Sequence, residues 1–425
     1  MTNRGVSAVR RALFSSLLLF VSALAALAQN GGTAASVGAT LTPEQKEQVL
    51  KSIGDVVTQR MFVPGIDFAK WPEIVEKNRE SLDKAEDERS FALAVNRVLR
   101  EFGISHVRLR TPQAGQQRRT GPQAIGLGIQ AQKEDSGALL VTTVAPNSPA
   151  AAAGLESGDR IQEVDGKTPE SATALNGEAD SKVALKVLKK NGETVSLDLT
   201  RRAFSTARQD NVTWPSEDTA VLKVHSFSRG YVRDNIEKLI QEASKAKYLI
   251  LDLRSNGGGA TNNLIHLLSL LLPNDTSVGV FVSRRTYTEY EKANPDKPKD
   301  LAAIGTWAPN KYTTRKGRVE PFAGKIAVLV NRGSASASEI CAAALRETAG
   351  APILGTRTAG AVLASTYARL ALDWEIQYPV TDYVTIKGMR LEGNPLQPDH
   401  EVTGNGSGAE DPAIKKAMET LKAAG

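Results

Sequence analysis

The stretch KIAVLVNRGSASASEICAA, residues 325–343, joins two apolar runs through a short loop. The first run, residues 325–331, has the length and the β-branched content of a buried strand, and the second starts a helix near Ala337. Glycine and serine separate the two runs, as they do in tight turns between elements. The stretch therefore predicts a strand–loop–helix unit, the building block of an α/β domain.

The same alternation extends over the region from about residue 211 to residue 402. Further elements are expected as strands at 220–227, 248–254 and 278–283 and as helices at 232–246, 262–272 and 412–423. Strands alternating with helices indicate crossover connections within one α/β domain. Residues 284–320 are polar, and we expect them to form a surface excursion.

Two different patterns precede this region. Residues 42–102 carry apolar residues at helical spacing, and Gly103 supplies a helix stop, after which residues 104–112 change to strand-like alternation. Residues 121–202 consist of short β-branched runs between Gly, Pro, Asn and Asp. That composition predicts a small β-rich module placed between a helical segment and the α/β domain.

The N-terminus has the parts of a secretory signal: a basic start, an apolar run at 12–27, and small residues at Ala26 and Ala28. The apolar run is shorter than the roughly 20 residues of a membrane-spanning helix, so export is favoured over an uncleaved anchor. Without residues 1–28, the chain has 50 basic and 47 acidic residues, because Arg4, Arg10 and Arg11 are removed from the 53. This balance gives no reason to expect a nucleic acid partner. We expect a periplasmic or extracellular location.

Cysteine and metal-ligand patterns limit the chemistry further. Cys341 is the single cysteine, so the chain has no intrachain disulfide, and its place in an apolar helix favours a core role. We find no cluster of His, Cys and acidic residues at ligand spacing, and we expect neither a metal nor another cofactor. The 41% hydrophobic and 24% charged content is that of an ordinary globular protein.

Three segments within the β-rich region resemble a PDZ domain: AIGLGIQ at 124–130, VAPNSPAAAAGLESGDRIQEVDGK at 144–167 and VALKVLKKNGE at 183–193. The resemblance implies a module that binds peptide C-termini by strand addition. The carboxylate-binding loop would consist of Ile125, Gly126, Leu127, Gly128 and Ile129.

Two loops of the α/β region have compositions suited to catalysis, although each also has a simpler explanation. The glycines of DLRSNGGG, residues 252–259, suit a loop whose N–H groups bind an anion, but they would equally suit a tight turn. The serines at 334, 336 and 338 lie at a helix entry, where any of them could act as an N-cap.

In this order, DLRSNGGG, NRGSASASEI (331–340), GTRTAGAV (355–362) and LEGNPLQPD (391–399) resemble the S41 serine peptidases, that is, the carboxyl-terminal processing peptidases and their tricorn-core-like relatives. The resemblance implies an α/β fold, with a crotonase-like or ClpP-like peptidase core, an inserted PDZ domain and a helical N-terminal segment. It implies Ser336 as nucleophile, and Gly258 and the backbone of Ala337 as the oxyanion hole.

The chain departs from this family at the general base. The processing peptidases place a lysine after the glycine of GTRTAG, whereas this chain has Ala361. The other branch of the family uses a histidine that follows the helical segment, and His106 in GISHV stands there. His225 is the second choice. A histidine base needs an orienting acceptor, and the resemblance implies Glu392 for that role.

We therefore expect an exported serine endopeptidase that captures protein or peptide substrates by their C-termini through the PDZ domain. The alternative is an inactive peptide-binding scaffold of the same fold. An acyl-CoA enzyme would share only the core and would not explain the PDZ module. The oligomeric state is left open. The expected boundaries are 1–28 for the signal peptide, 29–40 for a linker, 41–112 for the helical segment, 113–203 for the PDZ domain, 204–410 for the peptidase core and 411–425 for a C-terminal helix.

Overall fold

The computed structural model describes residues 39–121, 123–228, 230–404 and 408–423. The predicted signal peptide and all but the last two residues of the predicted linker lie outside these ranges. Among the described residues, no helix has both the length and the apolar character that crossing a membrane requires.

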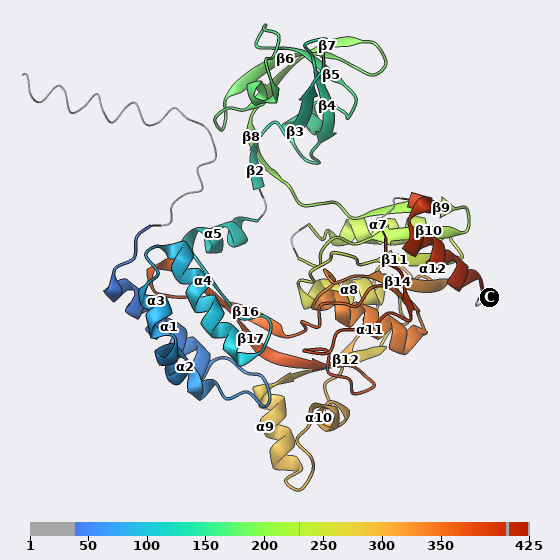
Figure 1. Cartoon of the computed structure of the whole chain (residues 1–425). Coiled ribbons are helices and arrows are strands. Elements are labelled where there is room, and N and C mark those ends of the chain that lie inside the picture. The colour runs from blue at the N-terminus through green and yellow to red at the C-terminus, as the bar shows by residue number, and fades with distance from the viewer. Residues whose placement is uncertain (1–38, 122, 229, 405–407, 424–425) are drawn as a thin grey trace, which may run out of the picture.

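A six-stranded sheet forms the centre of the α/β part, in the order β18-β15-β14-β11-β10-β9 (Figure 1). Five neighbouring strands are parallel, and the edge strand β9 is antiparallel to β10. The strands are β9 (Asn211–Ser216), β10 (Thr219–Lys223), β11 (Tyr248–Asp252), β14 (Lys325–Val330), β15 (Ile353–Gly355) and β18 (His400–Glu401). The carboxyl ends of parallel strands meet at one edge, which brings the loops after β11 and β14 together.

Helices cover both faces of this sheet because its strands are apolar on both sides. Three helices share one core with alternate strand residues such as Leu251 and Val328: α7 (Arg233–Ala243), α8 (Thr261–Ser269) and α11 (Ala337–Ala349). The intervening residues, such as Ile250 and Leu329, pack against α12 (Pro412–Ala423).

A second, antiparallel sheet joins the α/β part to the N-terminal helices. Its strands are β1 (Arg108–Arg110), β12 (Ser277–Ser283), β13 (Tyr312–Thr313), β16 (Ala364–Arg369) and β17 (Glu375–Val384). Four helices bury one side of β1, β16 and β17: α1 (Pro43–Gln59), α2 (Trp71–Lys77), α3 (Arg79–Asp83) and α4 (Glu88–Leu99). Helical structure over residues 42–102 was predicted, and within it α2 and α3 are two short, consecutive helices. By pairing with β17, the strand β1 thus joins the helical segment to the second sheet.

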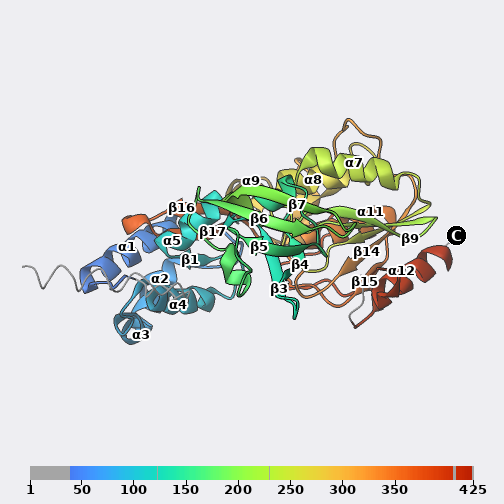
Figure 2. The ribbon, with the colours of Figure 1, turned by 90° about the horizontal axis from the view of Figure 1, so that it is seen from above.

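The β-rich module stands apart from the rest of the molecule in Figure 1. It has a five-stranded antiparallel sheet with its own core around Leu139, Ile161 and Leu185. Its strands are β3 (Ile129–Lys133), β4 (Leu139–Val144), β5 (Arg160–Val164), β6 (Lys182–Leu188) and β7 (Thr194–Thr200), with the short helix α6 (Pro149–Ala152). A separate pair, β2 (Gln123–Gly126) and β8 (Arg202–Ser205), leads into and out of it. Seen from above, the module lies over the centre of the elongated molecule (Figure 2).

Residues 284–320 are more ordered than the polar composition suggests. They contain α9 (Arg284–Ala293) and α10 (Leu301–Trp307), which share a small core with β12. Tyr290 is buried in that core, and its ring contacts Trp307 edge-on. The expected surface excursion therefore contains two helices, and a few aromatic residues pack them onto a strand.

Candidate active site

A pocket of about 630 Å³ opens where the second sheet meets the loops after β11 and β14. Ser336, Ala337, Gly258 and His106 all line it, although they lie in three different parts of the sequence. The structure therefore brings the expected nucleophile, oxyanion-hole residues and base around one space.

Ser336 occupies a strained turn at the start of α11. Its φ of 57° and ψ of −118° lie outside the regions that residues with side chains prefer. Such strain persists only where surrounding contacts hold it, and it is common at nucleophiles on strand-to-helix turns. Here the Ser336 N–H donates to the carbonyl of Ala361 at 2.9 Å and to Oε2 of Glu339 at 3.1 Å. The hydroxyl is left partly exposed in the pocket.

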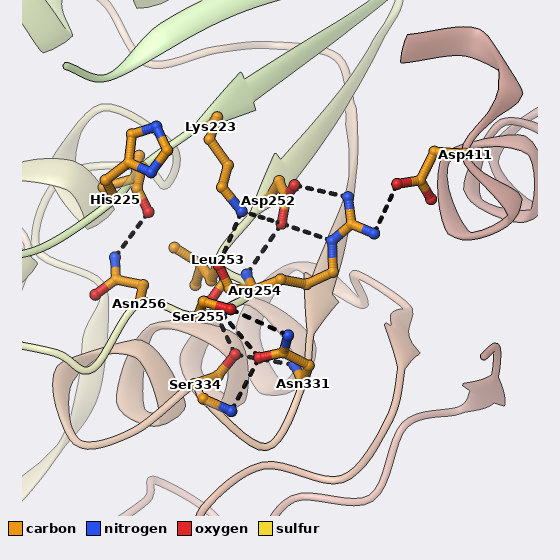
Figure 3. Close-up of polar contacts among 12 residues, drawn as sticks. Lys223, His225, Asp252, Leu253, Arg254, Ser255, Asn256, Asn331, Ser334 and Asp411 are labelled. Atoms are coloured by element: carbon orange, nitrogen blue, oxygen red, sulfur yellow. Dashed lines mark hydrogen bonds and ion pairs between the residues drawn. The ribbon is translucent and has the colours of Figure 1, made fainter. Parts of the chain in front are cut away.

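The two neighbouring serines have structural contacts instead. Ser334 is buried, and its hydroxyl donates to the carbonyl of Leu253 at 2.8 Å (Figure 3). The buried Ser338 hydroxyl donates to the carbonyl of Asn256 at 2.7 Å. Both bonds tie the serine loop to the glycine loop. Of the three serines, only Ser336 lines the pocket.

An ion-pair network fixes the glycine loop from its other side. Arg254 lies between Asp252 and Asp411, at 2.8 Å from a carboxylate oxygen of each, and Lys223 lies 2.9 Å from Asp252 (Figure 3). Burial alone would raise the pKa of Asp252, but hydrogen bonds and charge from Arg254 and Lys223 lower it, so the carboxylate stays ionised. The network anchors the end of β11 to the segment before α12.

Glu339 connects the serine loop to the segment that follows β15. It is fully buried, and it accepts hydrogen bonds from the N–H groups of Gly360 at 2.8 Å and Ala361 at 3.0 Å, as well as from Ser336 and the Thr358 hydroxyl. Burial raises the pKa of Glu339 although these donors oppose the shift. The sequence gives no signal for this role of Glu339, because an acid in the first turn of a helix is ordinary.

Gly258 lies directly against the nucleophile. Its φ is 89°, and a Cβ added there would come within 2.7–2.9 Å of Ala335 O, Ser336 Cβ and Ala337 N. Its N–H donates to Oδ1 of Asn256 at 2.9 Å. The N–H of Ala337 is a first-turn donor, which an α-helix leaves without an intrahelical partner. Of the two expected oxyanion-hole donors, the N–H of Ala337 is free of an intrahelical bond. The N–H of Gly258 is already bonded to Asn256 and would have to be shared.

Ala361 lies beside Ser336, because its backbone carbonyl accepts the Ser336 N–H. Its methyl side chain, however, cannot act as a base. Among the described residues that line the pocket, none is a lysine. Lys387 lies in an exposed turn after β17.

His106 reaches the same pocket from the segment between α4 and β1. Its backbone has a positive φ of 57°, and Gly103 ends the preceding helical turn with a φ of 68°. These two turns point the chain from the helical segment toward the peptidase core. The residues that follow enter β1, which pairs with β17.

Ser105 links His106 to Glu392. The Ser105 hydroxyl donates to Oε2 of Glu392 at 2.7 Å and lies 2.6 Å from Nδ1 of His106. A hydroxyl has one proton to donate, so it must accept from Nδ1–H. This bond assigns the tautomer in which Nε2 is free to accept a proton. Glu392 is buried, and it also accepts from the N–H groups of Ser105 and Val362, each at 2.7 Å.

The comparisons with known proteins match this architecture. Residues 218–402 match the model described as peptidase family S41, and residues 126–207 match the model of a PDZ domain. The chain carries an S41 peptidase domain and a PDZ domain. The resemblance found in the sequence is confirmed, as is the α/β fold with an inserted β-rich module and a helical N-terminal segment.

Two curated proteins are similar to this chain. The carboxyl-terminal-processing protease of Synechocystis sp. is 29% identical over 307 residues, covering 69% of this chain and 66% of the relative. The carboxy-terminal processing protease CtpA of Bacillus subtilis is 26% identical over 288 residues, covering 64% and 55%. The chain thus spans about half to two thirds of the length of the curated relatives it matches.

A solved structure of the tricorn protease is similar in fold to this chain. It superposes with a TM-score of 0.61 at 15% identity, covering 88% of this chain and 36% of that one. At this identity the likeness concerns the fold alone.

Burial dominates the electrostatics of His106. It lowers the pKa of His106 below the usual 6.5, and the nearby charge of Glu392 opposes the shift. The neutral form, which can accept a proton, is therefore favoured near neutral pH. The ring needs no protonation to keep its place, because the Ser105 hydroxyl orients it.

The other histidines of the S41 domain lie outside this pocket. The N–H of His225 donates to Asp210 at 2.7 Å, and the imidazole of His266 bonds to Tyr231 at 2.9 Å and Glu237 at 3.1 Å. His400 lies in the edge strand β18. Cys341 is buried, and burial raises the pKa of its thiol, which leaves it neutral.

The PDZ domain has its own pocket of about 490 Å³, lined by the whole predicted loop from Ile125 to Ile129 and by the apolar side chains of Leu175 and Phe204. Gly128 has a φ of 79°, and an added Cβ would lie 2.2 Å from that of Ser148. The loop therefore requires glycine at this position.

Two residues of the candidate site were not predicted from the sequence: Ser105 and Glu339. Ser105 precedes the predicted base directly, yet its contact with Glu392 spans 287 positions and has no local signal. A hydroxyl beside a candidate histidine was the one available indication.

Proposed function

We propose that this chain is an exported serine endopeptidase that hydrolyses peptide bonds with Ser336 as nucleophile and His106 as general base. The proposal rests chiefly on the hydrogen-bonded series His106, Ser105 and Glu392, which leaves Nε2 unprotonated beside the pocket that contains Ser336. Export rests on the secretory pattern of the N-terminus. Two similar proteins are named as processing proteases.

In the first step, His106 Nε2 takes the proton of the Ser336 hydroxyl while the oxygen attacks the scissile carbonyl. The imidazolium that forms keeps its Nδ1–H on Ser105, and Glu392 stabilises the new charge through the Ser105 hydroxyl. The N–H of Ala337 stabilises the oxyanion, and that of Gly258 adds a second donor once it turns from Asn256. His106 then protonates the leaving amine, and water repeats the sequence on the acyl-enzyme.

The PDZ domain supplies the second part of the proposal. Its glycine loop would hold a free C-terminal carboxylate, and its apolar pocket would take the last side chain of the substrate. Substrates are therefore proteins or peptides with exposed C-termini. The PDZ domain stands apart from the sheets of the α/β part in Figure 1, and on this proposal the captured end and the cleaved bond belong to different parts of one extended chain.

The test is the hydrolysis of an unstructured protein by the purified mature chain and by Ser336→Ala. We expect the variant to lose activity by at least about 10³-fold with an unchanged unfolding midpoint. Ser228→Ala is the matched control, since Ser228 lines the same pocket and has no role in the proposed steps. Equal turnover by wild type and Ser336→Ala would contradict the assignment. Absence of turnover in both would favour the inactive peptide-binding scaffold.

A further inference from the structure

One wall of the Ser336 pocket is the polar face of the antiparallel sheet. Side chains alternate along β1 and β17, so that Leu109 and Ile376 are buried against the N-terminal helices. The opposite face carries Arg110 and Gln377, which line the pocket. Tyr367 on β16 pairs with Gln377 and lines the pocket too, with 37% of the residue exposed.

Arg110 places a positive charge at the pocket wall, and its contact with Glu375 is longer than a hydrogen bond. Its Nε is buried, and the described residues give that atom no hydrogen-bond partner. Nη2 donates to Oε1 of Gln377 at a long 3.3 Å, and the Glu375 carboxylate is 3.9 Å from Nε. That separation is too long for a hydrogen bond.

Glu375 is engaged by other residues. Arg118 binds both of its oxygens, at 2.6 and 2.7 Å, and Arg119 lies 3.2 Å away. Three arginines therefore surround one buried carboxylate, and the two shortest contacts of Glu375 are to Arg118 and not to Arg110. Gln377 is held by a bond from its Nε2 to the Ser365 hydroxyl at 2.8 Å, which points its oxygen at Arg110. The guanidinium is thus oriented by a neutral group.

We propose that Arg110 binds a carboxylate of the peptide substrate, so that the enzyme prefers an acidic group near the scissile bond. The Nε of Arg110 is buried toward Glu375, so a substrate carboxylate would approach the two Nη groups, which can bind both of its oxygens at once and match it better than a neutral group does. The inference rests on the proposed function, since it concerns the same pocket. The carboxylate comes from an internal Asp or Glu side chain or from the C-terminus of a short peptide.

The test uses short fluorogenic peptides that differ only by Glu or Gln at one position, scanned on both sides of the cleaved bond. All of them have amidated C-termini, which excludes capture by the PDZ loop. We expect one Glu peptide to exceed its Gln twin in kcat/KM by about ten- to hundredfold. Arg110→Gln should bring that ratio close to one, and Arg110→Lys should restore part of it. Arg108→Gln removes a second, exposed arginine of the same strand that does not itself line the pocket, and it should keep the wild-type ratio.

Binding of the same peptides to Ser336→Ala, followed by fluorescence anisotropy, repeats the comparison without turnover. A Glu preference that disappears in the Ser336→Ala/Arg110→Gln double variant supports the inference even if hydrolysis fails, a result that would contradict only the proposed function. Free-acid forms of the Gln peptides make a separate arm; if they bind better than their amidated forms in an Arg110-dependent way, the carboxylate is that of the C-terminus. Equal binding and cleavage of all twins by wild type, or a preference that survives Arg110→Gln, would overturn the inference. Unfolding midpoints exclude misfolded variants.

Discussion

At the scale of single residues, the site depends on how one hydroxyl distributes its single proton. Ser105 donates to Glu392 and therefore must accept from His106, so an ordinary side chain sets the tautomer of the base. The side chain has no other role that we can assign. Its contribution can therefore be measured separately from those of the histidine and the nucleophile.

We predict that Ser105→Ala lowers kcat by about 10²-fold, within the range that general base catalysis contributes, with little change in KM. The alanine removes the acceptor for Nδ1–H and the link to Glu392 but keeps the base itself. Steady-state kinetics on one peptide measure the effect. Ser105→Thr is the control, because it keeps the hydroxyl and should retain much more activity. Equal losses in the two variants would show that the hydroxyl is not what matters.

At the scale of elements, the buried carboxylate of Glu339 at the start of α11 holds the serine loop and the segment after β15 together. Glu339 accepts from three backbone N–H groups and one hydroxyl, which come from both the serine loop and the segment after β15. These contacts maintain the strained backbone of Ser336. Stability and catalysis should therefore depend on the same residue.

Glu339→Gln should lower the free energy of unfolding by about 2–4 kcal/mol, because the amide nitrogen would face N–H donors and leave buried groups without partners. Activity should fall as well, since Ser336 loses part of its support. Urea unfolding and peptide hydrolysis measure the two effects. Glu347→Gln, on the same helix and only partly buried, should cost less than about 0.5 kcal/mol. A fully stable and active Glu339→Gln variant would show that these contacts do not maintain the turn.

Local patterns predicted the elements better than they predicted the contacts among them. The strand–loop–helix around Ser336 and the strand that precedes the glycine loop at 257–259 follow from apolar runs and turn residues, and both are present. Periodicity could not find the roles of Ser105 and Glu339, because each depends on where distant loops meet. The two helices within residues 284–320 were likewise not predicted, because they depend on how Tyr290 and Trp307 pack in one small core.

At the scale of the whole molecule, the proposed site exists only because the helical segment packs against the peptidase core. His106 and Ser105 come from the N-terminal side of the PDZ insertion, and Ser336 and Glu392 come from its far side. The antiparallel pair of β1 and β17 fixes this arrangement, with Arg110 opposite Glu375. Arg118 in α5 (Pro112–Thr120) adds a second tie to Glu375, close to where the chain enters the PDZ domain.

If the PDZ domain captures the substrate, a free C-terminal carboxylate on the substrate should raise kcat/KM. Amidating the C-terminus of a long unstructured substrate should lower kcat/KM by at least about fivefold, because the glycine loop loses a charged acceptor. Parallel assays of the free-acid and amidated forms measure this. Gly128→Val, which places side-chain atoms against Ser148, should remove the difference between the two forms. Identical rates for both forms in the wild type would exclude the PDZ domain from substrate capture.

The activation of Ser336 by His106 is tested most directly by the pH dependence of covalent labelling with a serine-directed fluorophosphonate, followed by intact-protein mass spectrometry. The base acts only when neutral, and burial lowers the pKa of His106 below 6.5. The labelling rate should therefore rise with pH through one ionisation below 6.5 and then stay level, with the adduct on Ser336. His106→Gln should lose this rise and nearly all labelling. Undiminished labelling of His106→Gln, or a rate that rises only above about pH 8 as for a lysine base, would contradict the account.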